Sequence, residues 1–169
     1  GKGILVTRSA DQAGEFARML TAKGAAVFEC PTIKLIQPRS WAEIDGEIKR
    51  LSLFNWAIFT SANAVNFFFD RLTAKGLDCR AFGSCRICAV GPKTAALLAA
   101  RGIKADLMPA DYKAEGVVAE FKKIDLSGKR VLCPRADKAR ELIPQELGKM
   151  GAVVAAPVAY RNTLPDALP

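Results

Sequence analysis

Short apolar segments alternate with segments of helical periodicity over almost the whole chain, and this alternation limits the folds open to it. Residues 4–6 form an apolar strand candidate, after which Ala13, Phe16 and Leu20 recur at helical spacing until Gly24. Repeated strand–helix–strand units build parallel sheets with helices on both faces. We therefore expect an α/β protein with flavodoxin-like or Rossmann-like parallel sheets. Strands are predicted at 4–6, 25–30, 56–59, 86–90, 105–108, 131–133 and 152–156, and helices at 11–23, 41–51, 61–72, 92–100, 113–123 and 138–150.

The beginning of the chain is repeated near its end. Residues 1–27 align without gaps on residues 128–154, and eight of the 27 aligned pairs are identical. Each copy has the pattern strand, arginine-bearing turn, helix, glycine and strand. The repeat indicates either a duplication or two independent uses of one βαβ pattern.

Two extended segments divide the chain, because prolines bracket residues 31–38 and residues 157–165. We expect them to form a two-stranded linker between two α/β domains. Residues 1–36 are predicted to be the N-terminal part of a discontinuous domain 1, to which residues 161–169 return, and residues 37–160 to form a continuous domain 2. If the repeat is a duplication, the second copy is about 85 residues shorter than the first, and domain 1 is truncated here.

The charge of the chain favours anionic partners, since 25 Lys and Arg stand against 17 Asp and Glu and give a net charge of +8. The basic residues are scattered rather than gathered in a block of about five to eight, so no nucleic-acid partner is expected. No apolar run reaches the roughly 18 residues of a membrane span, so no membrane partner is expected either.

The absence of histidine excludes histidine-assisted nucleophiles and histidine-ligated metal sites. The five cysteines are odd in number, and Cys85 and Cys88 form a C-x-x-C motif without the second pair that a zinc ribbon requires. We therefore expect reduced, structural thiols, a cytoplasmic location and no metal site.

Four strand-to-helix turns are candidates for a binding site, because ligands of parallel sheets bind outside the carboxyl ends of the strands. Backbone N–H groups at helix N-termini favour anions, and the hydroxyls of Thr60, Ser61 and Thr94 add donors. The alternative is that Ser61 and Asn63 cap a helix and that Arg8 is a solvated surface residue. The candidate substrate-binding residues are Arg8, Thr60, Ser61, Ala62, Asn63, Gly91, Pro92, Lys93, Thr94 and Arg135.

At these turns the sequence resembles the uroporphyrinogen-III synthase family. The matching segments are ILVTR (4–8), FTSANAV (59–65), AVGPKTA (89–95), YKAEG (112–116), RVLCPRA (130–136) and VAYRN (158–162). The segments occur in the order and spacing of the family, and together they span nearly the whole chain. The resemblance implies two α/β domains joined by a two-stranded connection, with a cleft between them and a C-terminal half that completes the discontinuous domain.

The reaction that the resemblance implies is the conversion of hydroxymethylbilane to uroporphyrinogen III, a lyase step of tetrapyrrole (haem, sirohaem and cobalamin) biosynthesis. Water is lost, the last pyrrole ring is inverted and the macrocycle closes, with no metal or organic cofactor. The substrate is a polycarboxylate with eight carboxylates, which suits a basic protein. By motif, Tyr160 is the expected catalytic residue and assists departure of the hydroxyl, while the turns hold propionates and acetates.

Further expectations concern the state of the protein. The Gly-Lys start resembles synthases fused behind a uroporphyrinogen-III methyltransferase, so a fused methyltransferase domain is one expected partner, and we expect a monomer. One rival interpretation is a non-catalytic anion- or nucleotide-binding flavodoxin-like module, which would bind a phosphate ligand tightly without turning over hydroxymethylbilane. Another is a structural partner domain of a larger enzyme.

Overall fold

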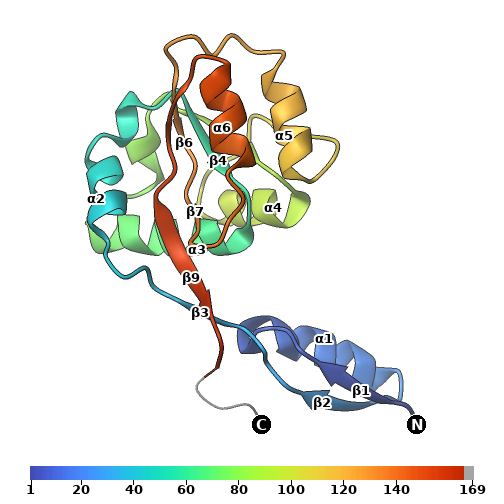
Figure 1. The fold of residues 1–169 in the computed structure, drawn as a ribbon. Coiled ribbons are helices and arrows are strands. Elements are labelled where there is room, and N and C mark those ends of the chain that lie inside the picture. The colour runs from blue at the N-terminus through green and yellow to red at the C-terminus, as the bar shows by residue number, and fades with distance from the viewer. Residues whose placement is uncertain (166–169) are drawn as a thin grey trace. The chain divides into compact units, whose positions relative to one another are not determined.

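The structure, a computed structural model, describes residues 1–165 apart from the side chains of residues 10–12. Contacts between residues divide the chain into two compact units, whose ribbons are drawn in Figure 1. Unit 1 contains Gly1–Ile36 and the segment that begins at Arg161, and unit 2 contains Gln37–Tyr160. Within residues 1–165, no helix has the length and apolar character needed to cross a membrane.

Unit 2 is built around a four-stranded parallel sheet with the strand order β5-β4-β6-β8. All four residues of β4 are buried, as is typical of a central strand in a parallel sheet that is covered on both faces. The predicted α/β class with parallel sheets is confirmed. The strands are β4 (Trp56–Phe59), β5 (Arg86–Ala89), β6 (Arg130–Leu132) and β8 (Val153–Ala155).

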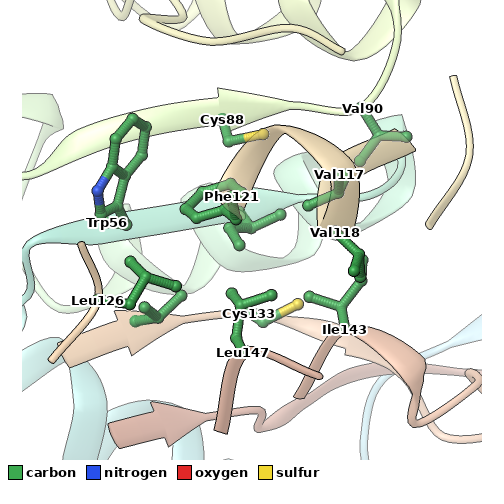
Figure 2. Close-up of a cluster of buried hydrophobic side chains, with 12 residues drawn as sticks. Trp56, Cys88, Val90, Val117, Val118, Phe121, Leu126, Cys133, Ile143 and Leu147 are labelled. Atoms are coloured by element: carbon green, nitrogen blue, oxygen red, sulfur yellow. The ribbon is translucent and has the colours of Figure 1, made fainter. Parts of the chain in front are cut away.

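Helices pack against both faces of this sheet. The contacts of β4 show this, because successive residues of a strand point to opposite faces. Trp56 belongs to a buried cluster with residues of α5 and α6, and its ring meets that of Phe121 edge-on with centroids 5.0 Å apart (Figure 2). Phe59 instead packs against Phe68 of α3 and Phe82 of the 3-10 turn η2. The helical elements are α2 (Ala42–Lys49), η1 (Leu51–Leu53), α3 (Ala62–Ala74), η2 (Cys79–Phe82), α4 (Pro92–Ala100), α5 (Ala114–Phe121) and α6 (Leu142–Lys149).

The order of the strands reverses at β4. From β4 the chain moves to β5 on one side of the sheet, and it then returns to add β6 on the other side. In open α/β sheets, ligands bind at such a switch point, outside the carboxyl ends of the strands. The ends of β4 and β6 are therefore the place in unit 2 where a site is expected.

The strand predicted at 105–108 is wrong, because the structure has only an isolated parallel bridge between Cys88 and Leu107 there. The carboxylate of Asp106 accepts the backbone N–H of Ile87 at 2.7 Å. A side chain thus satisfies a donor of β5 that a fifth strand would otherwise use. The sheet of unit 2 consequently contains four strands where the sequence pattern suggested five.

The helix predicted at 138–150 is shorter, since α6 begins only at Leu142. The residues before it form the two-residue strand β7 (Arg135–Ala136), which pairs in parallel with β9 (Val158–Thr163). The guanidinium of Arg135 also donates to the carbonyl of Ala139 at 3.3 Å. These contacts hold the turn in a non-helical conformation and delay the start of the helix.

The described residues of unit 1 contain one βαβ unit of β1 (Gly3–Val6), α1 (Ala10–Ala22) and β2 (Ala26–Glu29). The two strands pair in parallel. Val6, Ala13 and Ala17 are buried between the helix and the sheet, but Leu5 and Phe28 are 61% and 63% exposed. The described part of unit 1 therefore leaves apolar side chains of its sheet open to solvent.

A separate strand pair lies at the end of unit 1. β3 (Lys34–Ile36) pairs antiparallel with the last residues of β9, from Arg161 to Thr163. The earlier residues of β9 belong to unit 2, where Val158 and Tyr160 pair with β7. The segments that the prolines bracket are thus extended.

Candidate functional site

A pocket of about 200 Å³ lies in unit 2 at the carboxyl ends of β4 and β6. It coincides with the switch point of the sheet, where α/β proteins bind ligands. The lining contains two arginines and is otherwise mainly apolar. The residues that line it are Thr60, Ala114, Cys133, Arg135, Ala139, Arg140, Ile143 and Pro144.

Arg135 is tied firmly into the protein. Its Nε donates to the carbonyl of Ala156 at 3.1 Å and its Nη1 to the carbonyl of Ala139 at 3.3 Å. The same Nη1 forms an ion pair with Glu141, and the side chain is only 18% exposed. Because two of these partners are backbone carbonyls, Arg135 shapes the wall of the pocket, and its Nε and Nη1 are already engaged within the protein.

Arg140 is held more loosely at the same pocket. Its Nη2 pairs with Oε1 of Glu115, and the two side chains are 64% and 55% exposed. The hydrogen bond from Arg140 lowers the pKa of Glu115, so this carboxylate is ionised at neutral pH. Glu115 is placed by the close approach of α5 to the preceding loop, since a Cβ at Gly116 would overlap the carbonyl oxygen of Asp111.

Three buried cysteines in or next to the strands of unit 2 are structural. Cys85, Cys88 and Cys133 are buried and unpaired, and burial raises the pKa of each thiol to about 12. Figure 2 shows Cys88 and Cys133 inside the apolar cluster beneath α5 and α6. Thiols that stay protonated at neutral pH are poor nucleophiles and poor metal ligands. Within residues 1–165, no group of three His, Cys, Asp or Glu side chains is arranged to hold a metal ion.

Ser61 and Tyr160, which are 99 residues apart in the sequence, come together in unit 2. The oxygen of Ser61 accepts the N–H of Ala64 at 3.1 Å and so caps α3, as the alternative interpretation predicted. The same oxygen lies 3.3 Å from the hydroxyl of Tyr160. The Tyr160 ring stacks on Phe67 with centroids 5.4 Å apart, and the residue is only 7% exposed. The phenol is therefore held in one orientation by a hydroxyl at one end and a ring on its face.

The other turn residues of β4 lie beside this pair. Thr60 follows the last residue of β4 and lines the pocket. Ala62 opens α3, and Asn63 follows it in the first turn of that helix. Thr60 thus lies at the pocket and Ser61 at Tyr160, while Ala62 and Asn63 lie at the N-terminus of α3.

The turn after β5 forms the N-terminus of α4. Gly91 is the N-cap in an extended conformation that any residue can adopt, and Pro92 occupies the first turn as predicted. A Cβ at Gly91 would make ordinary contact with Tyr112, at 3.7 Å. Lys93 is exposed, whereas Thr94 is 5% exposed and directed into the protein. Lys93 and the first N–H groups of α4 are thus more accessible to a ligand than the Thr94 hydroxyl.

Arg8 belongs to unit 1, where it follows β1. Its guanidinium lies 5.3 Å from the centre of the Phe16 ring of α1, an arrangement typical of a cation–π contact. The side chain is exposed. Arg8 is therefore available for binding, but it lies in a different unit from the other candidates.

A second pocket in unit 2, of about 240 Å³, lies over α3 and is lined in part by Trp41 and Phe67. Arg71 lies 5.1 Å from the Trp41 ring centre and forms two hydrogen bonds with Asp45. The Arg71 hydrogen bond holds the pKa of the Asp45 carboxyl well below its usual range. Because its charged lining is already paired, this second pocket is a weaker candidate.

Sequence reasoning missed Arg140 and Glu115 as site residues. Glu115 lies in the YKAEG segment and Arg140 in the turn that replaces the first part of the predicted helix. The early end of β6 and the late start of α6 bring Arg140 to the pocket. Only the recurrence of basic residues between the two elements could have signalled this.

Comparison with known proteins identifies the family. A family model described as "Uroporphyrinogen-III synthase HemD" matches residues 14–169. A uroporphyrinogen-III synthase from Synechococcus elongatus is 42% identical over 170 residues, which cover 100% of this chain and 64% of that relative. One from Chlorobaculum parvum is 27% identical and covers 98% of this chain and 65% of the relative. The chain therefore spans slightly less than two thirds of the length of these relatives.

The fold is also similar to a solved structure. A crystal structure of a mutant uroporphyrinogen III synthase from Thermus thermophilus matches 98% of this chain and 64% of that chain, with a TM-score of 0.73. The sequence identity is 18%, so this similarity shows the fold alone.

Proposed function

Because the chain belongs to the uroporphyrinogen-III synthase HemD family, we propose that it converts hydroxymethylbilane to uroporphyrinogen III, as a lyase of tetrapyrrole biosynthesis. The relatives named for this activity support the proposal over a phosphate- or nucleotide-binding module. The substrate is a flexible polycarboxylate that must be curled until its ends meet. Positioning alone can lower the barrier to such an intramolecular closure by about 7–11 kcal/mol.

The observation that carries the proposal is the contact between Tyr160 and Ser61, 3.3 Å apart. Ser61 accepts the Ala64 N–H, and it can donate its own hydrogen to the Tyr160 oxygen at the same time. The phenol O–H of Tyr160 is then left to donate to the hydroxyl of hydroxymethylbilane. The carbon–oxygen bond breaks, the hydroxyl leaves as water with this proton, and the proton that ring closure releases restores the phenol.

The accessible groups among the remaining candidate residues bind the carboxylates in this proposal. The N-termini of α3 and α4 present backbone N–H groups and the positive ends of helix dipoles. Lys93 adds a charge at the second of these turns, and a carboxylate-binding role of Arg8 stays a prediction from the sequence. Several modest anion contacts are sufficient here, because the substrate has many carboxylates to share among them.

Removal of one oxygen atom from Tyr160 tests the catalytic role. We expect Tyr160→Phe in the full-length protein to form uroporphyrinogen III about a hundredfold more slowly, while the ring stack on Phe67 is kept. Ser61→Ala is expected to lower the rate by a smaller factor. The type III and type I products are separated by chromatography after reaction with hydroxymethylbilane.

Ser52→Ala serves as the matched control, because Ser52 is an exposed serine of unit 2 in η1, outside the turns of the site. If Tyr160→Phe keeps the rate and isomer ratio of the parent, Tyr160 has no catalytic role. A full-length protein that yields no type III product at all would overturn the synthase assignment itself.

We also propose the domain organisation that the prolines suggested, with residues 1–36 in a discontinuous domain and residues 37–160 in a continuous one. Two features support it: the division of contacts falls between Ile36 and Gln37, and β3 pairs with β9. A monomeric state, a cytoplasmic location and a fused methyltransferase domain stay predictions from the sequence.

A further inference from the structure

We propose that the pocket at the carboxyl ends of β4 and β6 binds one carboxylate arm of the ligand. In this proposal Arg140 releases Glu115 and forms an ion pair with the carboxylate of the arm instead. The inference rests on the proposed function, because it assumes a ligand with carboxylate arms. It adds a ligand-binding residue that neither the sequence motifs nor the turn geometry indicated.

The size of the pocket suits an arm and excludes the whole ligand. Sites for drug-sized molecules usually have volumes of about 300–1,000 Å³, whereas this pocket has about 200 Å³. A tetrapyrrole is larger than a typical drug, so its rings must remain outside. A propionate or acetate arm has a short apolar stem and a charged tip, and it needs apolar walls and a cation near the mouth.

The lining of the pocket provides both. Ile143, Ala114 and Pro144 are apolar, and the protonated thiol of Cys133 adds no charge. The two arginines of the lining supply the positive charge. This combination matches the chemistry of an aliphatic carboxylate better than that of a phosphate, which has no apolar stem.

The partners of the two arginines decide which of them can exchange its partner for a ligand carboxylate. Arg135 donates to two backbone carbonyls, which an incoming carboxylate cannot replace without disrupting β7 and the turn after it. Arg140 has an exposed side chain whose partner is an equally exposed carboxylate. Exposed ion pairs of this kind contribute little net stability, so a second carboxylate can displace the first readily.

Glu115 does not lose all electrostatic support when Arg140 changes partner. Lys113 also acts to lower the pKa of Glu115, so a cation remains close to the released carboxylate. The exchange therefore replaces one carboxylate on Arg140 with another and leaves no buried charge unpaired. Glu115 acts as an internal competitor that keeps the guanidinium ordered at the mouth of the pocket until an arm arrives.

Opposite effects of two substitutions test the exchange. The probe is uroporphyrin III, a stable macrocycle with eight carboxylates, titrated into the full-length protein and followed by its absorbance. We expect Arg140→Gln to weaken binding about five- to tenfold, because a charge-assisted contact is lost. Glu115→Gln should instead tighten binding about two- to fivefold, because the competitor is neutral.

Matched controls separate this local effect from the change in net charge. Glu146→Gln removes the same charge as Glu115→Gln from an ion pair with Lys149 on α6, and Arg80→Gln removes the same charge as Arg140→Gln from an exposed pair with Asp78. Both controls should bind uroporphyrin III within about twofold of the parent.

Two results would overturn the inference while the proposed function stands. One is a synthase that is active but whose Arg140 and Glu115 variants behave like the two controls. The other is weaker binding by both Arg140→Gln and Glu115→Gln, which would show that the pair only stabilises the structure. A protein that neither binds uroporphyrin III nor forms type III product would overturn the proposed function, and this inference with it.

Discussion

The two βαβ copies, residues 1–27 and residues 128–154, have the same local pattern and very different surroundings. Leu5 aligns with Leu132 and Leu20 with Leu147. Leu132 and Leu147 are fully buried, whereas Leu5 is 61% exposed. Both copies form a strand, a helix and a second parallel strand. The local pattern therefore determines the elements, and the burial of the same leucine depends on what packs against it.

The neighbours of the two strands explain the difference. β6, which contains Leu132, pairs with β4 on one side and β8 on the other. Within the described residues, β1, which contains Leu5, pairs with β2 alone. A two-stranded sheet is at best marginally stable by itself. Unit 2 can thus support a site on the ends of its strands, while unit 1 has less of its own structure to hold a residue such as Arg8 in place.

The largest expected difference between the copies comes from truncating the aligned leucines in the 169-residue chain. Leu132→Ala should lower the free energy of unfolding by about 2–5 kcal/mol, because it leaves a cavity in a packed core. Leu5→Ala should lower it by less than about 0.5 kcal/mol, because the side chain is mostly exposed. Urea unfolding followed by circular dichroism and by tryptophan fluorescence measures both.

Equal losses of unfolding free energy in the two leucine variants would contradict this difference between the copies. They would show that Leu5 is packed against other residues in solution, and that the two copies are buried to the same degree.

A smaller difference is expected from the glycines that end the two helices. Gly24 and Gly151 are aligned and both have positive φ, at 80° and 90°. A Cβ at Gly24 would meet no atom within 4 Å, whereas one at Gly151 would lie 3.2 Å from the Cα of Ser127. We expect Gly24→Ala to lower the free energy of unfolding by about 1 kcal/mol and Gly151→Ala to lower it by about 2 kcal/mol.

Hydrogen exchange of the strand amides next to each glycine measures these two losses separately. A larger loss at Gly24 would contradict the packing that distinguishes the second copy from the first.

Much of unit 2 could be predicted from the sequence because local signals agree with the tertiary structure. Pro92 marks the start of α4, and Gly102, with a φ of 86°, follows its end. The apolar run at 56–59 coincides with the buried strand β4. The signals failed where contacts from distant residues decide the outcome, as at Leu107, where the Asp106 carboxylate takes a donor of β5.

The site was predictable only in part, for the same reason. The turns at Thr60–Ser61 and Gly91–Pro92 follow from strand ends, which sequence patterns locate well. The contact between Ser61 and Tyr160 joins residues 99 positions apart, and no local pattern encodes it. The firm anchoring of Arg135 and the loose pairing of Arg140 depend on the turn before α6, where the helix begins later than predicted.

The two ends of the unit 2 sheet offer a final contrast, since both carry arginines. At the amino ends of the strands, Arg86 lies 4.5 Å from the Trp56 ring centre and Arg130 lies 5.6 Å from that of Phe54. At the carboxyl ends lie the helix N-termini of α3 and α4 and the pocket with Arg140. Charge alone does not distinguish the ends, but the carboxyl ends combine cations with helix N-termini and the pocket described above.

The most direct test is an amide chemical-shift map of the ¹⁵N-labelled protein during titration with uroporphyrin III. The largest shift changes are predicted at the amides of Ser61, Ala62, Lys93 and Arg140, at the carboxyl ends of the strands. Shift changes concentrated at Asn55, Arg86 and Arg130, at the amino ends of the strands, would contradict the location of the site.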